Sequence, residues 1–250
     1  MKKPLSIAHR GFSGIYPENT LLSFAKAIEI NPDGMECDIH LSADGKVIVI
    51  HDDSLDRTTD KIGKIAELDS AIIRSADAGV KKDPQFQGEK VPFFEELLEM
   101  TRGTIFLCVE LKAKGTPKPA VDLIRKYGME DQVIIFSFDS NLIMQVKEIA
   151  PVLPTLQLSW LDPKRSETID MSMISRKVLN ARANCLGINR EIMTPELARW
   201  LHSRGIFTGC YTVNEEPEMK RLINCDVDAI ISDYPDRLLR VLADVQSPVE

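Results

Sequence analysis

Long apolar runs are absent from this sequence of 250 residues. No stretch approaches the ~20 consecutive apolar residues that a membrane-spanning helix requires, and integral membrane association is therefore not expected. The lysine-containing start, Met1–Pro4, leads into only four mildly apolar residues before His9. Such a segment is far too short for the core of a signal peptide, so we expect a cytoplasmic protein.

Cysteine is scarce, and there is no excess of positive charge. The five cysteines are odd in number, contain no Cys-x-x-Cys pair and fall mostly in apolar runs, which favours buried thiols over disulfides or zinc sites. They are Cys37, Cys108, Cys185, Cys210 and Cys225. The 31 basic and 38 acidic residues give a net charge of −7. Proteins that bind nucleic acid are more often basic, so we expect no nucleic-acid partner.

Short apolar runs alternate with amphipathic, helix-like stretches along the whole chain. The strand-like runs are Leu5–Ala8, Met35–Ile39, Val47–Ile50, Ile105–Leu111, Val133–Ser137, Thr155–Leu158, Cys185–Ile188, Ile206–Thr212 and Ala229–Ser232. Helical periodicity appears in residues 20–30, 118–127, 141–149, 195–203 and 236–245. Repeated βα units of this kind predict a parallel sheet, either closed as a barrel or open and doubly wound.

One of the nine strand-like runs does not fit an eight-stranded barrel. Only residues 42–46 separate the second run from the third, and a parallel crossover needs a dozen or more residues. The Asp44-Gly45 pair is instead typical of a tight turn. The sequence therefore predicts an α/β fold, a (β/α)8 TIM barrel with a β-hairpin over residues 39–50 after strand two. That hairpin would return His51 to the side of Asp38.

Residues 53–100 interrupt the βα pattern, apart from a helix expected near Pro92–Met100. We interpret this segment as a small insertion over the barrel mouth, where loops determine specificity. The chain as a whole, residues 1–250, is expected to form one TIM-barrel domain, because barrels of this length are commonly undivided.

Three carboxylates are expected at the mouth of the barrel. Glu36 and Asp38 are two residues apart on one strand, so both side chains leave the same face, ~6.6 Å apart. Either could be a solvated charge at a strand end. Glu110, however, also lies at the carboxyl end of a strand, and in barrels that end carries the active site. Three carboxylates favour a hard divalent cation, Mg²⁺ or Ca²⁺ with Mn²⁺ as a further candidate, over zinc.

Basic side chains follow the same strands. His9 and His51 fall at strand ends beside the carboxylates, and a pair of histidines can divide acid and base catalysis. Arg10 offers a planar fork that matches phosphate oxygens. Lys112 shares the face of Glu110, which favours phosphate contact. A Schiff-base role for Lys112 is the alternative, although the neighbouring carboxylate would stabilise its charged form.

The other two histidines are expected to have no role in chemistry. His202 falls on a surface helix. His40 shares the face of Glu36 and Asp38, and a supporting role there is the less favoured interpretation.

Eight short motifs along the chain resemble those of the glycerophosphodiester phosphodiesterase family, in that family's order. They are His9-Arg10-Gly11, Pro17-Glu18-Asn19-Thr20, Glu36-x-Asp38, Asp44-Gly45, His51-Asp52, Glu110-Leu111-Lys112, Thr212-Val213-Asn214 and Ser232-Asp233-x-Pro235. Tyr211 and Phe93 depart from the residues common in the family, tryptophan and threonine. These two differences bear on the pocket wall and on substrate preference, not on the chemistry.

The resemblance implies a barrel that hydrolyses glycerophosphodiesters, small molecules, to sn-glycerol 3-phosphate and an alcohol. The implied roles are metal ligand for Glu36, Asp38 and Glu110, general acid–base catalysis for His9 and His51, and phosphate contact for Arg10 and Lys112. The resemblance does not distinguish attack by water from attack by a glycerol hydroxyl, nor the acid from the base.

Three other functions remain open at this point. A lysophospholipid-cleaving phosphodiesterase would need an apolar groove, which Phe86, Phe93 and Phe94 could line, although core packing explains these aromatics better. A lysine-dependent aldolase or lyase and a non-catalytic phosphate-binding barrel are further alternatives. The head group and the oligomeric state have no signal in the sequence.

Overall fold

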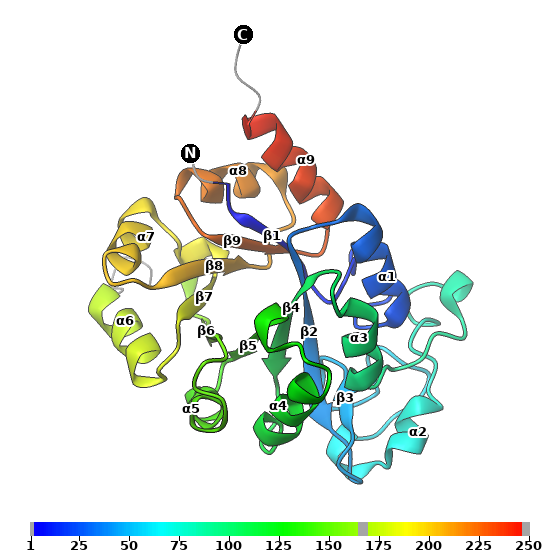
Figure 1. Cartoon of the computed structure of the whole chain (residues 1–250). Coiled ribbons are helices and arrows are strands. Elements are labelled where there is room, and N and C mark those ends of the chain that lie inside the picture. Colours follow the sequence, from blue (N-terminus) through cyan, green and yellow to red (C-terminus); the bar gives the residue numbers. More distant parts are fainter. Residues whose placement is uncertain (1–2, 165–169, 247–250) are drawn as a thin grey trace.

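A computed structural model describes residues 3–164 and 170–246 of the chain. Eight parallel strands close into a barrel, because β1 pairs with β9 on one side and with β2 on the other. Helices surround this ring on the outside (Figure 1). The architecture is the closed TIM barrel that the sequence predicts once one of the nine strand-like runs is assigned to a hairpin.

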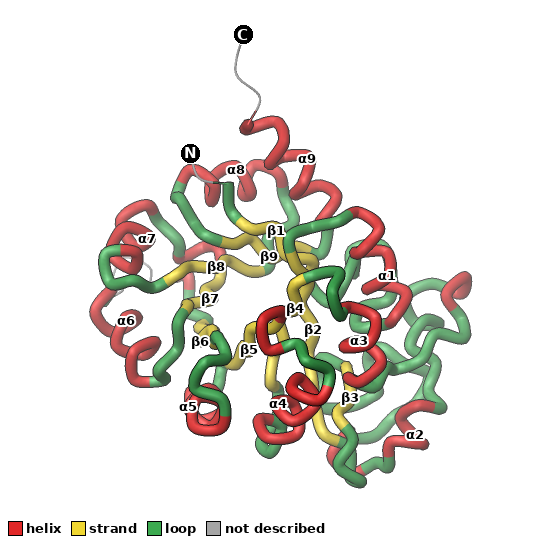
Figure 2. The backbone as a smooth tube through the Cα atoms, viewed as in Figure 1, coloured by secondary structure: helices red, strands yellow, loops and turns green. Residues whose placement is uncertain are grey.

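The strands lie where the apolar runs predict them, within one or two residues at each end. Their bounds are β1 Leu5–Ala8, β2 Gly34–Leu41, β3 Val47–Val49, β4 Phe106–Leu111, β5 Val133–Ser137, β6 Thr155–Ser159, β7 Cys185–Asn189, β8 Phe207–Tyr211 and β9 Ala229–Ser232. The helices are α1 Leu21–Ile30, α2 Ser70–Arg74, α3 Phe94–Thr101, α4 Pro117–Lys126, α5 Ser140–Ile149, α6 Met171–Asn180, α7 Pro195–His202, α8 Glu216–Asn224 and α9 Pro235–Gln246. Figure 2 shows the strands as an inner ring and the helices as an outer one.

Apolar side chains occupy both faces of the barrel wall. Two apolar clusters lie between the strands and the surrounding helices, and the larger of them is the main core. A further cluster fills the barrel interior with residues such as Ile134, Phe136 and Leu156. All five cysteines are free thiols, and four of them are buried. The expectation of unpaired cysteines in apolar surroundings is therefore confirmed.

The strand β3 runs antiparallel to β2, with Ile39 opposite Val49. The connecting turn places Gly45 at a φ of +79°, a left-handed conformation that favours glycine. The Asp44 carboxylate accepts hydrogen bonds from the Ser42 hydroxyl and from the backbone N–H and hydroxyl of Ser70. These bonds fix the turn and tie it to α2.

Residues 53–93 form a small extension with its own apolar cluster, which includes Leu55, Ile65 and Ile73 and packs on β3. The extension lies beside the barrel, next to α1 and α3 (Figure 1, cyan). The helix that follows it, α3, is the barrel helix between β2 and β4. Its Phe94 is fully buried in the main core, and Phe93 packs on the apolar cluster of the extension.

The amino-terminal end of the barrel contains an apolar cavity of about 150 Å³. Gly209 on β8 borders this cavity. Gly187 on β7 is the register partner of Gly209. Among the described residues, no helix has the length and apolar character needed to cross a bilayer.

Candidate active site

Polar residues gather at the opposite, carboxyl-terminal end of the barrel. Glu36 and Asp38 lie on β2, and Glu110 lies on the neighbouring strand β4, directly opposite Asp38 in the parallel register. Each offers a carboxylate oxygen, and these three oxygens lie within 4.8 Å of one another. The structure thus brings together the three carboxylates that the sequence predicts to be metal ligands.

Burial and mutual repulsion make this acidic cluster costly without a counter-charge. Burial raises the pKa of Glu36 well above its usual range, and the charges of Asp38 and Glu110 raise it further. Burial likewise raises the pKa of Glu110 to about 7, with a further contribution from Asp38. A cation bound between the three groups would stabilise their charged forms.

Two oxygens of the cluster have no hydrogen-bond donor in the described part of the chain. Glu36 Oε1 and Asp38 Oδ1 are both fully buried. Buried carboxylate oxygens are normally satisfied, so such atoms indicate a missing partner. An all-oxygen set of hard donors fits Mg²⁺ or Ca²⁺ better than zinc, because no cysteine or histidine belongs to the cluster.

Two cations flank the cluster. The Lys112 ammonium donates a hydrogen bond to Glu110 Oε1 at 2.8 Å and lies 3.5 Å from Asp38 Oδ1. The Arg10 guanidinium lies 3.3 Å from Asp38 Oδ2. Although burial opposes ionisation of Asp38, Arg10 and Lys112 outweigh it and lower the pKa of this carboxyl to about 2. Asp38 is therefore the ionised member of the cluster near neutral pH.

Arg10 owes its place to a tight turn after β1. Its backbone has a φ of +54°, and its N–H donates to Glu36 Oε2. Gly11 follows with a φ of +77°, and a Cβ at this position would come within 2.5 Å of the Ser23 hydroxyl oxygen. Only glycine fits this contact, which explains the glycine of the His-Arg-Gly sequence.

The residues Glu18 and Asn19, which the sequence singles out only as part of a motif, support the site directly. Glu18 accepts a hydrogen bond from the Arg10 guanidinium at 2.8 Å. The Asn19 amide donates to Asp38 Oδ2, and its oxygen accepts from the Asp38 N–H. These contacts hold one cation and one anion of the site in place.

A carboxylate that directly follows the last strand holds His9. Its Nδ1 lies 2.6 Å from Asp233 Oδ1, and Nε2 lies 3.9 Å from Glu36 Oε2. Asp233 in turn accepts hydrogen bonds from the Asn214 amide and the Ser13 hydroxyl. With Nδ1 held by Asp233, the ring presents Nε2 to the acidic cluster.

His51 follows β3 and is held in the same manner by its neighbour. Its Nδ1 lies 2.6 Å from Asp52 Oδ1. The Ile50 N–H donates to the Asp38 carbonyl, which continues the hairpin and carries His51 back toward the carboxylates, as the sequence predicts. Burial lowers the pKa of His51, against an opposing effect of Asp38. The ring is therefore predominantly neutral near neutral pH and able to accept a proton.

The two remaining histidines lie outside the candidate chemistry. His40 contacts the His51 carbonyl oxygen through Nε2 at 3.1 Å. His202 contacts Asp228 at 2.8 Å, at the amino-terminal end of β9. His40 is thus a neighbour that supports His51, and His202 lies at the far end of the barrel.

Asp52 and Asp233 are the site residues whose function the sequence does not reveal. Asp52 has a local signal, since it directly follows His51. Asp233 belongs to the motif Ser232-Asp233-x-Pro235, but nothing in that motif points to its partner His9, which lies 224 residues earlier. Barrel closure alone brings that pair together.

Comparison with known proteins extends this picture. The family model described as "Glycerophosphoryl diester phosphodiesterase family" matches residues 9–237. A glycerophosphodiester phosphodiesterase of Bacillus subtilis is 33% identical over 256 aligned positions, which cover 95% of this chain and 86% of the relative. One from Caldanaerobacter subterraneus subsp. tengcongensis is 32% identical, with 96% of this chain and 98% of the relative covered.

Solved structures show the same similarity. An Oleispira antarctica phosphodiesterase, in complex with the product sn-glycerol-3-phosphate, superposes with a TM-score of 0.88 at 28% identity. The match covers 96% of this chain and 97% of that protein. A putative glycerophosphoryl diester phosphodiesterase from Silicibacter pomeroyi also gives a TM-score of 0.88 at 28% identity, with 98% and 95% covered.

Proposed function

The chain belongs to the glycerophosphoryl diester phosphodiesterase family, and from this premise we propose that it hydrolyses glycerophosphodiesters to sn-glycerol 3-phosphate and an alcohol with the help of a divalent cation. One observation carries the proposal. Two histidine–carboxylate pairs flank a buried acidic cluster in which two oxygens lack a hydrogen-bond donor among the described residues. A barrel that only bound phosphate would need neither pair.

We assign Glu36, Asp38 and Glu110 as ligands of the cation, with Mg²⁺ or Ca²⁺ preferred and Mn²⁺ as a further candidate. When bound, the ion supplies Lewis-acid polarisation of a phosphoryl oxygen. The choice among these ions is part of the proposal and rests on the oxygen-only donor set.

A negatively charged diester fits this end of the barrel, because Arg10, Lys112 and, when bound, a divalent ion offer positive charge there. We propose that Arg10 and Lys112 contact the non-bridging oxygens of the diester, because the guanidinium fork suits phosphate and the ammonium acts as a point charge.

His9 and His51 are proposed to carry the proton transfers. With Nδ1 of each ring held by a carboxylate, Nε2 is the atom left for exchange with substrate. One ring removes a proton from the attacking hydroxyl, which belongs to water or to the glycerol, and the other protonates the departing alcohol oxygen. Attack by the glycerol hydroxyl gives a cyclic phosphate, which water then opens to sn-glycerol 3-phosphate with the two rings exchanging roles. The neutral form of His51 suits the first task.

The geometry disfavours the alternatives. Burial alone would lower the pKa of Lys112, but Asp38 and Glu110 outweigh burial and raise it, which opposes Schiff-base chemistry. An acyl-binding groove of Phe86, Phe93 and Phe94 finds no support, since Phe94 is buried in the main core and Phe93 packs in the extension. We also propose that the barrel and this extension form one domain, because the extension packs on β3.

The test is hydrolysis of glycerophosphocholine by the purified protein, with sn-glycerol 3-phosphate measured enzymatically. We expect turnover that a strong chelator abolishes and that one or more of Mg²⁺, Ca²⁺ and Mn²⁺ restores. Glu36→Gln should remain inactive at every metal concentration. Turnover that the chelator leaves untouched would remove the cation from the proposal, and no turnover of any glycerophosphodiester or lysophospholipid would refute the activity.

A further inference from the structure

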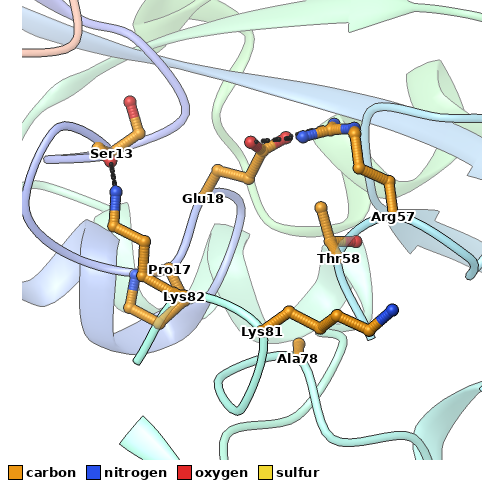
Figure 3. A pocket seen from close by; sticks show the side chains of 8 residues that line it. All are labelled: Ser13, Pro17, Glu18, Arg57, Thr58, Ala78, Lys81 and Lys82. Carbon is orange, nitrogen blue, oxygen red and sulfur yellow. Dashed lines mark hydrogen bonds and ion pairs between the residues drawn. The ribbon is translucent and has the colours of Figure 1, made fainter. Parts of the chain in front are cut away.

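Among the described residues of the extension, Arg57 alone contacts both Asp52, which holds His51, and Glu18, which holds Arg10. Its guanidinium donates four hydrogen bonds to two carboxylates. Two go to Asp52, from Nε at 2.6 Å and from Nη2 at 2.9 Å. The other two go to Glu18, from Nη1 at 2.9 Å and from Nη2 at 2.7 Å. Figure 3 shows the Arg57 side chain pointing at Glu18.

Each of these carboxylates also holds a residue of the candidate site. Asp52 Oδ1 is the atom that contacts His51 Nδ1, and Glu18 Oε1 is the atom that accepts from Arg10. A continuous chain of ionic hydrogen bonds therefore runs from His51 through Asp52, Arg57 and Glu18 to Arg10. It joins the hairpin side of the barrel mouth to the turn after β1.

We propose that Arg57 is a positioning residue that fixes the orientation of His51 and Arg10 relative to each other. This inference rests on the roles proposed above for those two residues. A planar fork is required, since one guanidinium must meet two carboxylates at once and a lysine ammonium offers only a point charge. The extension thereby completes the site without touching the reacting atoms.

The expected effect of Arg57 on the rate is much larger than its expected effect on the stability of the fold. The Arg57 side chain is 48% exposed, and ion pairs at such positions contribute only about 0–1 kcal/mol. In contrast, a misplacement of a catalytic group by about 1 Å can cost roughly 100-fold in rate. Loss of Arg57 should therefore affect turnover far more than folding.

The surroundings of Arg57 allow chemical rescue. A cavity of about 130 Å³ lies next to the guanidinium, bordered by Glu18, Thr58, Lys81 and Lys82 (Figure 3). Truncation of Arg57 would enlarge this space and leave the carboxylates of Glu18 and Asp52 facing it. Free guanidinium ion can then occupy the position of the missing group.

Arg74 provides a matched control within the same extension. It also makes a two-pronged contact, to Glu96 at 2.7 and 2.8 Å, and its side chain is 33% exposed. Glu96 contacts no residue assigned to the site in the described hydrogen bonds. Variants at Arg57 and Arg74 thus remove similar ionic contacts, and only those at Arg57 belong to the chain that reaches His51.

The experiment compares kcat, KM and urea unfolding of R57A, R57K, R74A and R74K, each with its metal. We expect R57A and R57K to lower kcat at least tenfold with a smaller change in KM, and guanidinium ion to restore several-fold activity to R57A alone. Both Arg74 variants should keep kcat within about twofold. The proposal fails if R57A retains kcat within twofold while the wild type turns over, or if all four variants lose activity in proportion to stability.

A readout without turnover distinguishes this failure from failure of the proposed function. The hydrogen-bonded Nδ1–H of His51 should give a low-field proton resonance, identified by its loss in His51→Asn. We expect R57A to shift or broaden this resonance and R74A to leave it unchanged. An unchanged resonance in R57A would overturn the positioning role, even if the wild-type protein hydrolysed no substrate.

Discussion

His9 and His51 are each held through Nδ1 by an aspartate. If they divide the proton transfers, His9→Ala and His51→Ala should each lower kcat by about 10²–10⁴-fold, the usual contribution of general acid–base catalysis. Steady-state hydrolysis of glycerophosphocholine with saturating cation measures the effect.

His202→Asn serves as the comparison for both variants. It removes the contact of His202 with Asp228 at the other end of the barrel. We expect its kcat to stay within about twofold of the wild-type value. Near-full activity in both alanine variants would exclude the acid–base assignment.

The ionisation of Asp233 should make the stability of the fold depend on pH in acid. Burial alone would raise its pKa, but the hydrogen bond and charge of His9, with help from Asn214 and Ser13, hold the pKa well below its usual range. A depressed carboxyl pKa stabilises the fold above the pKa of the unfolded chain, about 4, and this contribution is lost as the pH falls further. Asp233→Asn should therefore lower the free energy of unfolding by about 1–3 kcal/mol at neutral pH.

The difference in the free energy of unfolding between the wild type and Asp233→Asn should become smaller as the pH falls below about 4. Urea denaturation across a series of pH values measures it, and a gap that widened in acid would contradict the sign of the pKa shift. The same variant should lose at least tenfold in kcat, since the His9 ring would no longer be held by a carboxylate.

At the scale of elements, the turn between β2 and β3 controls where His51 lies. Gly45 adopts a φ of +79°, and a Cβ there would meet no atom within 4 Å, so only backbone strain opposes a side chain. Gly45→Ala should cost about 1–2 kcal/mol of unfolding free energy. Urea denaturation measures the loss.

Lys46→Ala is the neighbouring control for the turn. Its ammonium is exposed and lies 3.7 Å from Glu95, so the substitution should change stability by less than about 0.5 kcal/mol. Equal losses in the two variants would show that the turn conformation is not the cause.

The sequence predicts the strands well because each is a short apolar run bounded by turn residues. It predicts the hairpin because residues 42–46 are too few for a crossover. The alternation does not define α2, α6 and α8 in advance, since α2 has five residues and α8 is rich in charged side chains. Packing against the barrel, rather than local sequence, decides such helices.

At the scale of the whole molecule, the apolar cavity and the acidic cluster lie at opposite ends of the barrel, so substitutions at the cavity should change stability without changing the candidate site. A Cβ on Gly209 would lie 3.8 Å or more from its neighbours, in ordinary contact, whereas one on Gly187 would come within 2.6 Å of Leu158. Gly209→Ala should therefore stabilise the protein by about 0.4–1 kcal/mol. Gly187→Ala should destabilise it by about 1–3 kcal/mol.

Thermal or urea unfolding of the two alanine variants measures this difference, with kcat as the second readout. Both should keep kcat near the wild-type value under conditions where they are folded, because the site lies at the opposite rim. A large fall in kcat for the stabilised Gly209→Ala would contradict this separation of the two ends.

The candidate site is predictable from sequence where its residues are local and is not where they are distant. Glu36, Asp38 and Glu110 follow from strand position alone, because neighbouring parallel strands end at the same rim. The contact of His9 with Asp233, and the bridge from Arg57 to Glu18, depend on how the barrel closes and how the extension folds back. Neither pair shares a spacing that a periodic pattern could reveal.

The place of β1 between β2 and β9 has a consequence for how the protein matures on the ribosome. Translation makes Glu36, Asp38 and Glu110 well before Asp233, the residue that holds His9. Under the roles proposed above, the cation ligands are therefore all synthesised before His9, which is made first, can gain its partner.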